Sequence, residues 1–481
     1  MRFPSPRFAA ATALLGSWLS GCGAPATDDP EPVTSTTETF VLEGGRWLDV
    51  ETGTLHPNVG LRVVDGRIAA IGPSAAAPAS TPRLRLPDEW TILPGLIDLH
   101  AHYAVDLFGE GRVDETVAYP SIFLANGVTT TFPAGEMNPD RMRALAEAID
   151  RGERPGPRIL RSGPYFGSWR RGWDDDAMTR DSIFREVDHW VSTGVRGLKA
   201  KGIRAEPLRA LIERAHHHDV TVTGHLGSGY RGTVNPRDAI AMGIDRVEHF
   251  LGGDMMPADR TAYASLQTFD DFDGRALRDI IELYLDEGVY FDPTLSIYGY
   301  WGPHDEEMTA YWTDELRFLT PYMREIIEAR TPRPVMESFA RISSIKRRTL
   351  KAFYDAGGRD LITLGTDHPS WGRYWSGFGV HREILALARS GLPPEDVFRI
   401  ATLNGARAMD LDGELGSLET GKLADLVIVR GDPLADVRAA RDVAYVVARG
   451  RLHRAAELLA SVEGTIGPRA EAEEEAWRPD G

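Results

Sequence analysis

Short apolar runs alternate with helical patterns through the middle of the chain, and this alternation constrains the fold more than any other feature. The intervening segments, such as RMRALAEAID and EPLRALIERAHHH, have the periodicity of amphipathic helices. Strands that alternate with helices favour a parallel sheet, and eight such units predict a (β/α)8 barrel, the TIM barrel. The eight runs cover residues 96–102, 127–132, 158–163, 194–200, 220–225, 244–249, 289–295 and 361–367.

Further strand-like runs lie on both sides of this alternating region. In GLRVVDGRIAAIG the dipeptide Asp65-Gly66 separates two alternating segments, a strong signal for a β-hairpin. Similar runs, ADLVIVRGD and VAYVVARGRL, follow near the other end of the chain. We therefore expect a small β-sandwich domain formed from residues 39–93 and 411–460, with the barrel occupying residues 94–410 between its two parts.

The first residues have the pattern of a secretory signal. Arg2 and Arg7 precede an apolar stretch that ends in LSGC, and Cys22 is the only cysteine. This ending resembles a bacterial lipoprotein box, which implies cleavage after residue 21, lipidation of Cys22 and a lipid-anchored protein of the cell envelope, on the periplasmic face or the outer membrane. A plain secretory signal with an incidental cysteine is the alternative. Residues 22–38 are expected to form a flexible tether, and residues 461–481 a disordered acidic tail.

The charge balance argues against nucleic acid as a partner. The chain has 71 acidic and 54 basic residues and a formal net charge of −17. Phosphate contacts need clustered lysine and arginine. Apart from favouring solubility, this balance says little about partners. A small-molecule or dipeptide substrate is expected from the motifs described below, and membrane contact only through the lipid on Cys22.

Several runs end in residues that bind metals. In such barrels the chemistry lies at the C-terminal ends of the strands, and imidazole and carboxylate groups suit zinc or a similar divalent ion. One histidine alone is more often structural, so the prediction depends on the whole set arriving at five strand ends. The set is His100, His102, Lys199, His225, His249 and Asp367.

The motifs around these residues resemble the amidohydrolase superfamily, and most of all its imidazolonepropionase-like and prolidase-like branch. They are PGLIDLHAH, GVRGLK, VTGH, GIDRVEHF, LGTD and the stretch from ATLNGARAMDL to GSLETGKLADLVIVRGDPL. The resemblance implies two divalent metal ions, with zinc the expected element, and a metal-activated hydroxide as nucleophile. It also implies that Asp367 is the catalytic general acid and base. In that arrangement His100, His102 and Asp367 bind one ion, His225 and His249 bind the other, and a carboxylated Lys199 bridges them.

Two lysines compete for the bridging role. Lys199 and Lys201 in GVRGLKAKGIR share a strand face and lie about 6.6 Å apart along it. A buried lysine has a lowered pKa, and its neutral amine can add carbon dioxide to give a carbamate. Lys199 matches the strand-end lysine of the family. We expect Lys201 to lie at the mouth of the site, either solvated or near the substrate.

Possible substrate contacts are weaker predictions, because solvated charges and packed aromatic rings are common. Arg170, in the loop PYFGSWRRGW, could bind a substrate carboxylate. A long insertion after the seventh run suggests a lid. The candidate substrate contacts are Arg170, Tyr230, Tyr298, His304 and His368.

These observations favour a metal-dependent hydrolase that cleaves a carbon–nitrogen bond in an amide, a peptide or a cyclic amide, most similar to a dipeptidase or prolidase. Three alternatives stay open. One is a hydrolase of lactams, hydantoins or imidazolones. Another is an enzyme that keeps the metals but catalyses isomerisation or decarboxylation. The third is a non-catalytic metal-binding lipoprotein of the envelope.

Overall fold

The computed structural model describes residues 39–479, apart from 58–59, 175, 301–314, 332–335 and 369–374. The predicted signal, the tether, Cys22 and His304 lie outside the described residues. No helix in the described part of the chain is long and apolar enough to cross a membrane. The boundaries of the predicted domains stay predictions.

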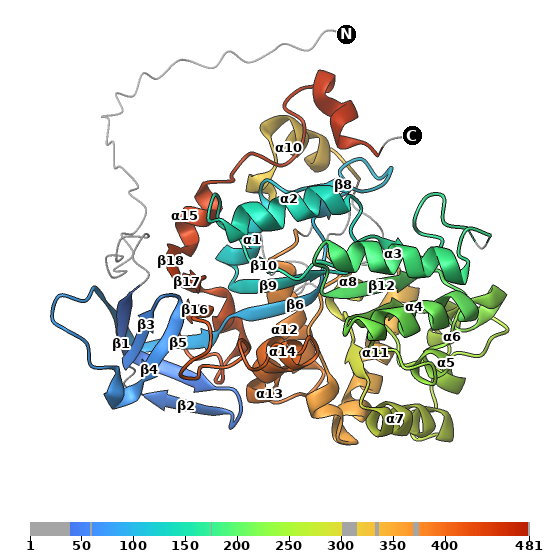
Figure 1. Cartoon of the computed structure of the whole chain (residues 1–481), viewed down its shortest axis with the longest axis horizontal. Coiled ribbons are helices and arrows are strands. Elements are labelled where there is room, and N and C mark those ends of the chain that lie inside the picture. The colour runs from blue at the N-terminus through green and yellow to red at the C-terminus, as the bar shows by residue number, and fades with distance from the viewer. Residues whose placement is uncertain are drawn as a thin grey trace, which may run out of the picture.

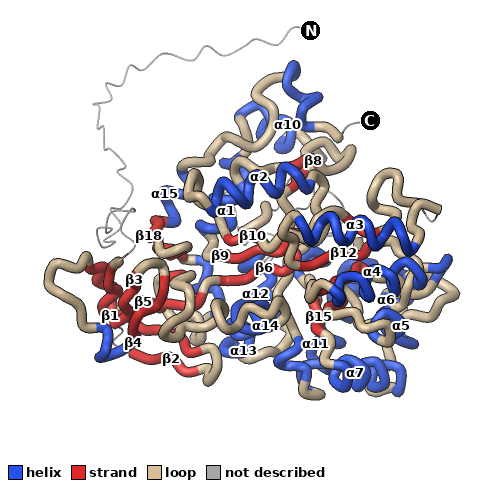
Figure 2. The backbone as a smooth tube through the Cα atoms, viewed as in Figure 1, coloured by secondary structure: helices blue, strands red, loops and turns tan. Residues whose placement is uncertain are grey.

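The described chain is a mixed α/β structure, in which helices lie on both sides of a central group of strands (Figures 1 and 2). The strands are β1 (Phe40–Asp49), β2 (Thr54–Pro57), β3 (Gly60–Val64), β4 (Arg67–Ile71), β5 (Arg83–Pro94), β6 (Leu96–Ala101), β7 (Ala104–Val105), β8 (Val113–Asp114), β9 (Val128–Pro133), β10 (Arg158–Ile159), β11 (Tyr165–Phe166), β12 (Gly197–Lys201), β13 (Thr221–His225), β14 (Arg246–Glu248), β15 (Tyr290–Asp292), β16 (Leu426–Val429), β17 (Val443–Ala448) and β18 (Arg451–Arg454). The helices are α1 (Tyr119–Ala125), α2 (Pro139–Asp150), α3 (Arg180–Ser192), α4 (Ala205–His217), α5 (Pro236–Ile240), α6 (Ala262–Leu266), α7 (Arg275–Glu287), α8 (Ser296–Tyr300), α10 (Pro321–Glu328), α11 (Glu337–Asp355), α12 (Gly379–Arg389), α13 (Pro394–Arg399), α14 (Gly405–Arg407) and α15 (Ala455–Ala460).

The central strands form two parallel sheets rather than one continuous sheet. Their orders are β10-β9-β6 and β11-β12-β13-β14-β15. Seven of the eight predicted runs contain one of these strands, and β11 is an addition that the sequence did not indicate. The prediction of parallel strands alternating with helices is therefore confirmed, whereas closure into a barrel is not directly seen.

The eighth run, residues 361–367, is extended but forms no regular strand. Its backbone forms only a few hydrogen bonds to the segments on either side, and one of them runs from Asp367 N–H to His100 O at 2.9 Å. Thr363 N–H donates to Phe291 O at 3.0 Å, and Leu99 N–H donates to Leu364 O at 2.9 Å. The amide of Thr366 instead donates to the side chain of Asp98 at 3.1 Å. A side-chain carboxylate thus takes the place of a neighbouring backbone carbonyl, which interrupts the ladder.

Strands from the two ends of the chain pair in one eight-stranded sheet, with the order β18-β17-β16-β5-β1-β3-β4 and β2 paired to β1. In Figure 1 the blue N-terminal strands lie against the red C-terminal ones. The predicted hairpin at Asp65-Gly66 is confirmed, because both residues have positive φ, as a tight two-residue turn requires.

The expected sandwich of two facing sheets is wrong in one respect, since this is a single curved sheet. Its edge strand β4 bonds to the segment that leads into β16, where Ile68 N–H donates to Lys422 O and Ala424 N–H donates to Gly66 O. One hydrophobic cluster draws on β1, β3, β4, β5, β16, β17 and β18. The sheet therefore wraps around its own core.

The acidic tail is folded, contrary to expectation. Ile466 is fully buried and its carbonyl accepts the Thr320 N–H at 2.9 Å. The segment Glu471–Trp477 forms a short helical turn, and Trp477 packs against the main hydrophobic core. Figure 1 shows this red segment beside α10. A few apolar side chains are enough to anchor a segment that its charge pattern marks as solvated.

Candidate metal centre

The predicted residues of the first metal site lie together. His100 lies near the end of β6 and His102 directly follows that strand. Asp367 is the last residue of the extended run beside it. Asp367 Oδ1 is 3.0 Å from His102 Nε2 and 3.4 Å from His100 Nε2. All three offer ligand atoms close enough to hold one ion.

The histidines of the second predicted site lie beside the first. The ring centroids of His225 and His249 are 4.2 Å apart, and those of His249 and His100 are 5.1 Å apart. Asp367 and His249 have positive φ, at 52° and 69°. Such backbone strain in non-glycine residues concentrates at functional sites.

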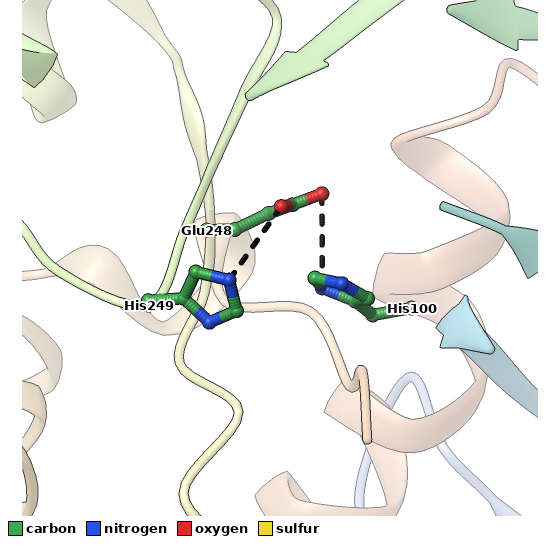
Figure 3. A group of neighbouring side chains, drawn as sticks. All are labelled: His100, Glu248 and His249. Atoms are coloured by element: carbon green, nitrogen blue, oxygen red, sulfur yellow. Dashed lines mark ion pairs between the residues drawn. The ribbon is translucent and has the colours of Figure 1, made fainter. Parts of the chain in front are cut away.

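Glu248 joins this cluster, although the sequence interpretation passed over it. Its carboxylate lies between two histidines, with Oε1 3.7 Å from His100 Nδ1 and Oε2 3.8 Å from His249 Nε2 (Figure 3). Successive residues of a strand face opposite sides, so the pair Glu248-His249 could supply only one inward side chain. The positive φ of His249 breaks that alternation, and both side chains turn to the same side. The only sign of this role in the sequence was that Glu248 directly precedes His249 in VEHF.

The structure separates the two lysines. Lys199 is buried, with 1% of its side chain exposed, and its ammonium pairs with Glu248. Lys201 is half-buried, and its Nζ lies 3.7 Å from the centroid of the Trp169 ring and 5.7 Å from that of Tyr165. Burial lowers the pKa of Lys199, and the Glu248 carboxylate opposes that shift. Only Lys199 thus faces the cluster of carboxylates and imidazoles.

Asp292 at the end of β15 is a further buried carboxylate that the sequence interpretation missed. Its Oδ2 lies 3.4 Å from His100 Nδ1, and burial raises its pKa well above the usual range. Gly365 allows this approach, because a Cβ there would lie 2.1 Å from Asp292 Oδ2. Asp292 lies in VYFDPTL, a run that the sequence predicts as a strand. Its place in that run was a signal for an inward-facing carboxylate, but not a specific one.

The protonation states suit metal ligands. Burial lowers the pKa of His100, His225 and His249 well below the usual value and that of His102 to about 4. These imidazoles are therefore neutral near pH 7, which is the form that binds metals. Burial tends to raise the pKa of Asp367, but His100 and His102 outweigh it and hold that pKa well below its usual range.

The donor set fits divalent cations. Within the described residues, His100 Nδ1, His249 Nε2 and both oxygens of Asp292 are buried without a hydrogen-bond partner. Unpaired buried polar atoms are costly, and a cation bound among these atoms would satisfy them. Two overlapping groups could each hold an ion, and they share His100: one contains His102 and Asp367, the other Glu248 and His249.

The segment after β15 orients His249. The Thr294 hydroxyl lies 2.7 Å from His249 Nδ1, and buried Lys346 donates to the Thr294 carbonyl at 3.2 Å. The Glu383 carboxylate accepts the next two backbone N–H groups of this segment. A partner on Nδ1 sets the ring orientation and leaves Nε2 facing the cluster.

The predicted substrate contacts have different surroundings. Tyr230 lines a cavity beside His225, as a contact residue would. Arg170 lines a second cavity, but it is already paired with Glu186 at 2.8 Å. Tyr298 is buried against the Phe339 ring, and His368 is fully buried with Nε2 3.1 Å from Ser296 Oγ. Packing in the interior covers the last two almost completely, with 3% of Tyr298 and none of His368 exposed.

Two cavities adjoin the cluster. The smaller, of about 220 Å³, includes His225, and the larger has a volume of about 670 Å³. Trp169 and Lys201 line both, so they form a shared wall. Arg112 lines the larger cavity and also a small recess that reaches His102.

This chain belongs to the Amidohydrolase family, whose model matches residues 91–453. Members of this family are hydrolases, and the family and its relatives together agree with action on carbon–nitrogen bonds.

Individual relatives agree with this placement. The chain is 26% identical over 402 residues to an adenine deaminase from Bradyrhizobium sp. strain BTAi1, covering 81% of this chain and 54% of the relative. It is similar in fold to a crystal structure of a Xaa-Pro dipeptidase with bound methionine, with a TM-score of 0.64, 20% identity and coverage of 86% of this chain and 100% of the other. A putative prolidase from Bifidobacterium longum also gives 0.64, at 24% identity and 91% and 98% coverage. The chain spans about half the length of the curated relatives it matches.

Proposed function

We propose that the chain is a metal-dependent hydrolase of a carbon–nitrogen bond, most similar in activity to a dipeptidase or prolidase. The observation that carries this proposal is the pair of overlapping ligand groups that share His100 at the ends of parallel strands. The family match supports hydrolysis, and the likeness to dipeptidase and prolidase structures supports the peptide-like substrate. The best alternative is hydrolysis of a cyclic amide.

We further propose two divalent ions, with zinc the expected element. His100, His102 and Asp367 would hold one ion, and His225 and His249 the other. Such ions act as Lewis acids and lower the pKa of water when bound. Lys199 would bridge them as a carbamate, for which burial supplies the necessary uncharged amine. Glu248, its partner in this structure, would then be free to approach the second ion.

Asp367 is the proposed catalytic proton carrier. Its carboxylate would accept a proton from the attacking water as the oxygen adds to the substrate carbonyl. It would then give that proton to the nitrogen as the carbon–nitrogen bond breaks. Asp367 is ionised near pH 7, as a group that accepts a proton must be, although its lowered pKa makes it a weak base in the absence of substrate.

The parallel strands are proposed to close into the predicted barrel. Bonds that link the two sheets support closure. Arg196 N–H donates to Arg161 O on one side, and residues 362–364 connect β15 to β6 on the other. Closure would bring all the strand ends to one face, where the ligand groups lie.

One experiment tests the function. Purified protein should hydrolyse a carbon–nitrogen bond in at least one member of a panel of dipeptides, N-acyl amino acids, cyclic amides and adenine, and form an amine and a carboxylate from any of the first three. Adenine is included because a relative is named adenine deaminase, and ammonia would be its product. A chelator should abolish the activity and added zinc should restore it, with metal content measured on the same sample. Full activity in metal-free protein, or metal-loaded protein inert to every class, would contradict the proposal.

Attachment to the envelope through a lipid on Cys22 is a separate proposal, motivated by the LSGC sequence. The full chain should incorporate a palmitate analogue and sediment with membranes, and Cys22→Ala should do neither. A wild-type protein that stays unlabelled and soluble after secretion would leave the plain secretory signal as the better interpretation.

A further inference from the structure

Two cations beside the metal centre lack an acidic partner. Arg112 and Lys201 both line the larger cavity. No carboxylate within the described ranges of the chain lies within ion-pair distance of either one, and Arg112 makes no hydrogen bond there. Half-buried cations without a partner are unfavourable, so their placement calls for an anionic ligand.

Arg112 stands between the cavity and the metal centre. It lies just before β8, is half-buried, and lines both the cavity and the recess that reaches His102. Burial of His102 is the largest cause of its lowered pKa, and the positive charge of Arg112 lowers that pKa further. Its guanidinium is therefore near the metal ligands as well as open to the cavity.

Lys201 is held in place by aromatic rings. Its Nζ lies over the rings of Trp169 and Tyr165, and both residues also line the larger cavity. A cation held between rings loses little conformational entropy when it binds an anion. Lys201 is the last residue of β12, two residues after Lys199.

Among the other charged groups of this cavity, Arg171 is exposed on the surface, and the rest have partners. Arg170 is paired with Glu186. Glu136 accepts the Ser162 N–H at 2.9 Å and lies 3.8 Å from Arg161, and Asp106 accepts the Gly109 N–H at 2.7 Å. Each acid of the wall thus has at least one local partner, although Glu136 Oε2 is buried without a hydrogen bond, and the cations of the described wall without an acidic partner are Arg112, Lys201 and the exposed Arg171.

The smaller cavity has the opposite character. Leu226, Val234, Phe250 and Tyr263 line it around His225. An apolar group of the substrate would gain by burial there, at about 25 cal/mol for each Å² removed from water. The two cavities therefore offer an apolar site and a positively charged site for an anion, on either side of the wall that contains Lys201.

We propose that Arg112 and Lys201 bind a free carboxylate of the substrate, while an apolar acyl group occupies the cavity beside His225. The substrate class is then N-acyl amino acids or dipeptides with an apolar acyl part and a free carboxyl end. This inference rests on the proposed function, since it assumes that the bond cleaved lies between the two cavities. Arg112 and Lys201 bind the substrate and take no part in proton transfer.

Kinetics test the substrate class. The best free-acid substrate should be cleaved about 10- to 100-fold more efficiently in kcat/KM than its carboxamide, from the 1.5–3 kcal/mol typical of a charged hydrogen bond. Arg112→Gln and Lys201→Gln should each remove most of this preference, mainly through KM, because kcat/KM falls much more for the free acid than for the carboxamide. Arg209→Gln, an exposed arginine on α4 outside both cavities, is the matched control and should change neither. Equal loss for acid and carboxamide would overturn the proposal.

Binding tests the anion site without catalysis. In calorimetry with metal-loaded protein, N-benzylglycine should bind at least about 10-fold more tightly than 2-(benzylamino)ethanol, which lacks the carboxylate. The preference should fall in Arg112→Gln, fall less in Arg112→Lys, and persist in Arg209→Gln. If it persists in Arg112→Gln and in Lys201→Gln, the metal captures the carboxylate and the proposal is wrong. If this binding pattern is found but no substrate is cleaved, the anion site stands and the proposed hydrolase function fails.

Discussion

Lys199→Ala is expected to lower the metal content from two ions per chain to one or fewer and to reduce kcat/KM on the order of 10³-fold, as the loss of several kcal/mol of Lewis-acid stabilisation implies. The reason is that the proposed carbamate contributes a ligand to both ions. Elemental analysis and steady-state kinetics on the same preparation measure the two effects. A short carboxylic acid added to the variant should restore part of the activity, because it can occupy the space of the carbamate.

The pairing of Lys199 with Glu248 offers a competing explanation, in which the lysine only neutralises a buried carboxylate. Breaking such a pair costs about 3–5 kcal/mol, so both explanations predict a lower free energy of unfolding. Metal content separates them. If Lys199→Ala is less stable but keeps two ions and is not rescued by a carboxylic acid, the bridging role is wrong.

Lys201→Ala is the matched control, two residues along the same strand. Its Nζ lies over the Trp169 ring and outside both ligand groups, so this variant should keep the full metal content. Its effect should be confined to substrates with a free carboxylate. Loss of metal from Lys201→Ala but not from Lys199→Ala would mean that the two lysines have been assigned to the wrong roles.

Asp367→Asn is expected to reduce kcat by about 10²- to 10⁴-fold, the usual contribution of general acid–base catalysis. The amide keeps the shape of the carboxylate but cannot accept the proton from water. Since Asp367 also belongs to a ligand group, metal content has to be measured in the variant and restored by excess zinc before the rates are compared.

Glu383→Gln provides a comparison for this result. It changes a buried carboxylate that holds the backbone of Leu295 and Ser296, away from the proposed reacting atoms. It should affect stability more than kcat at saturating zinc. Asp367→Asn with full metal content and an unchanged kcat would remove Asp367 from the catalytic role and leave it as a ligand only.

Particular residues show how far the sequence could predict the site. His100, His102, His225, His249 and Asp367 end runs that the sequence marked as strands, and parallel strands bring such ends to one edge. Their meeting in the structure therefore follows from periodicity and chain order. Glu248 could not be predicted in the same way, because it faces the cluster only through the positive φ at the next residue.

The predicted substrate contacts stay predictions, and two of them already have partners within the protein. Arg170 has the chemistry to bind a carboxylate, but Glu186, sixteen residues later on α3, already pairs with it. His368 follows Asp367 directly and yet is fully buried beside Ser296. Arg112 had no distinguishing motif, and its lack of a partner becomes visible only when the surrounding side chains are placed.

The sequence by itself determined the class of fold, the pairing of the two chain ends and the grouping of His100, His102 and Asp367, because these depend on local periodicity and on which residues end each strand. Only the tertiary structure decided which lysine is buried, which arginine is unpaired and that the acidic tail is folded. Those outcomes depend on contacts between residues far apart in the chain, such as Lys199 with Glu248 and Ile466 with Thr320. Burial and pairing set the charge and availability of a side chain, and neither can be read from its neighbours in sequence.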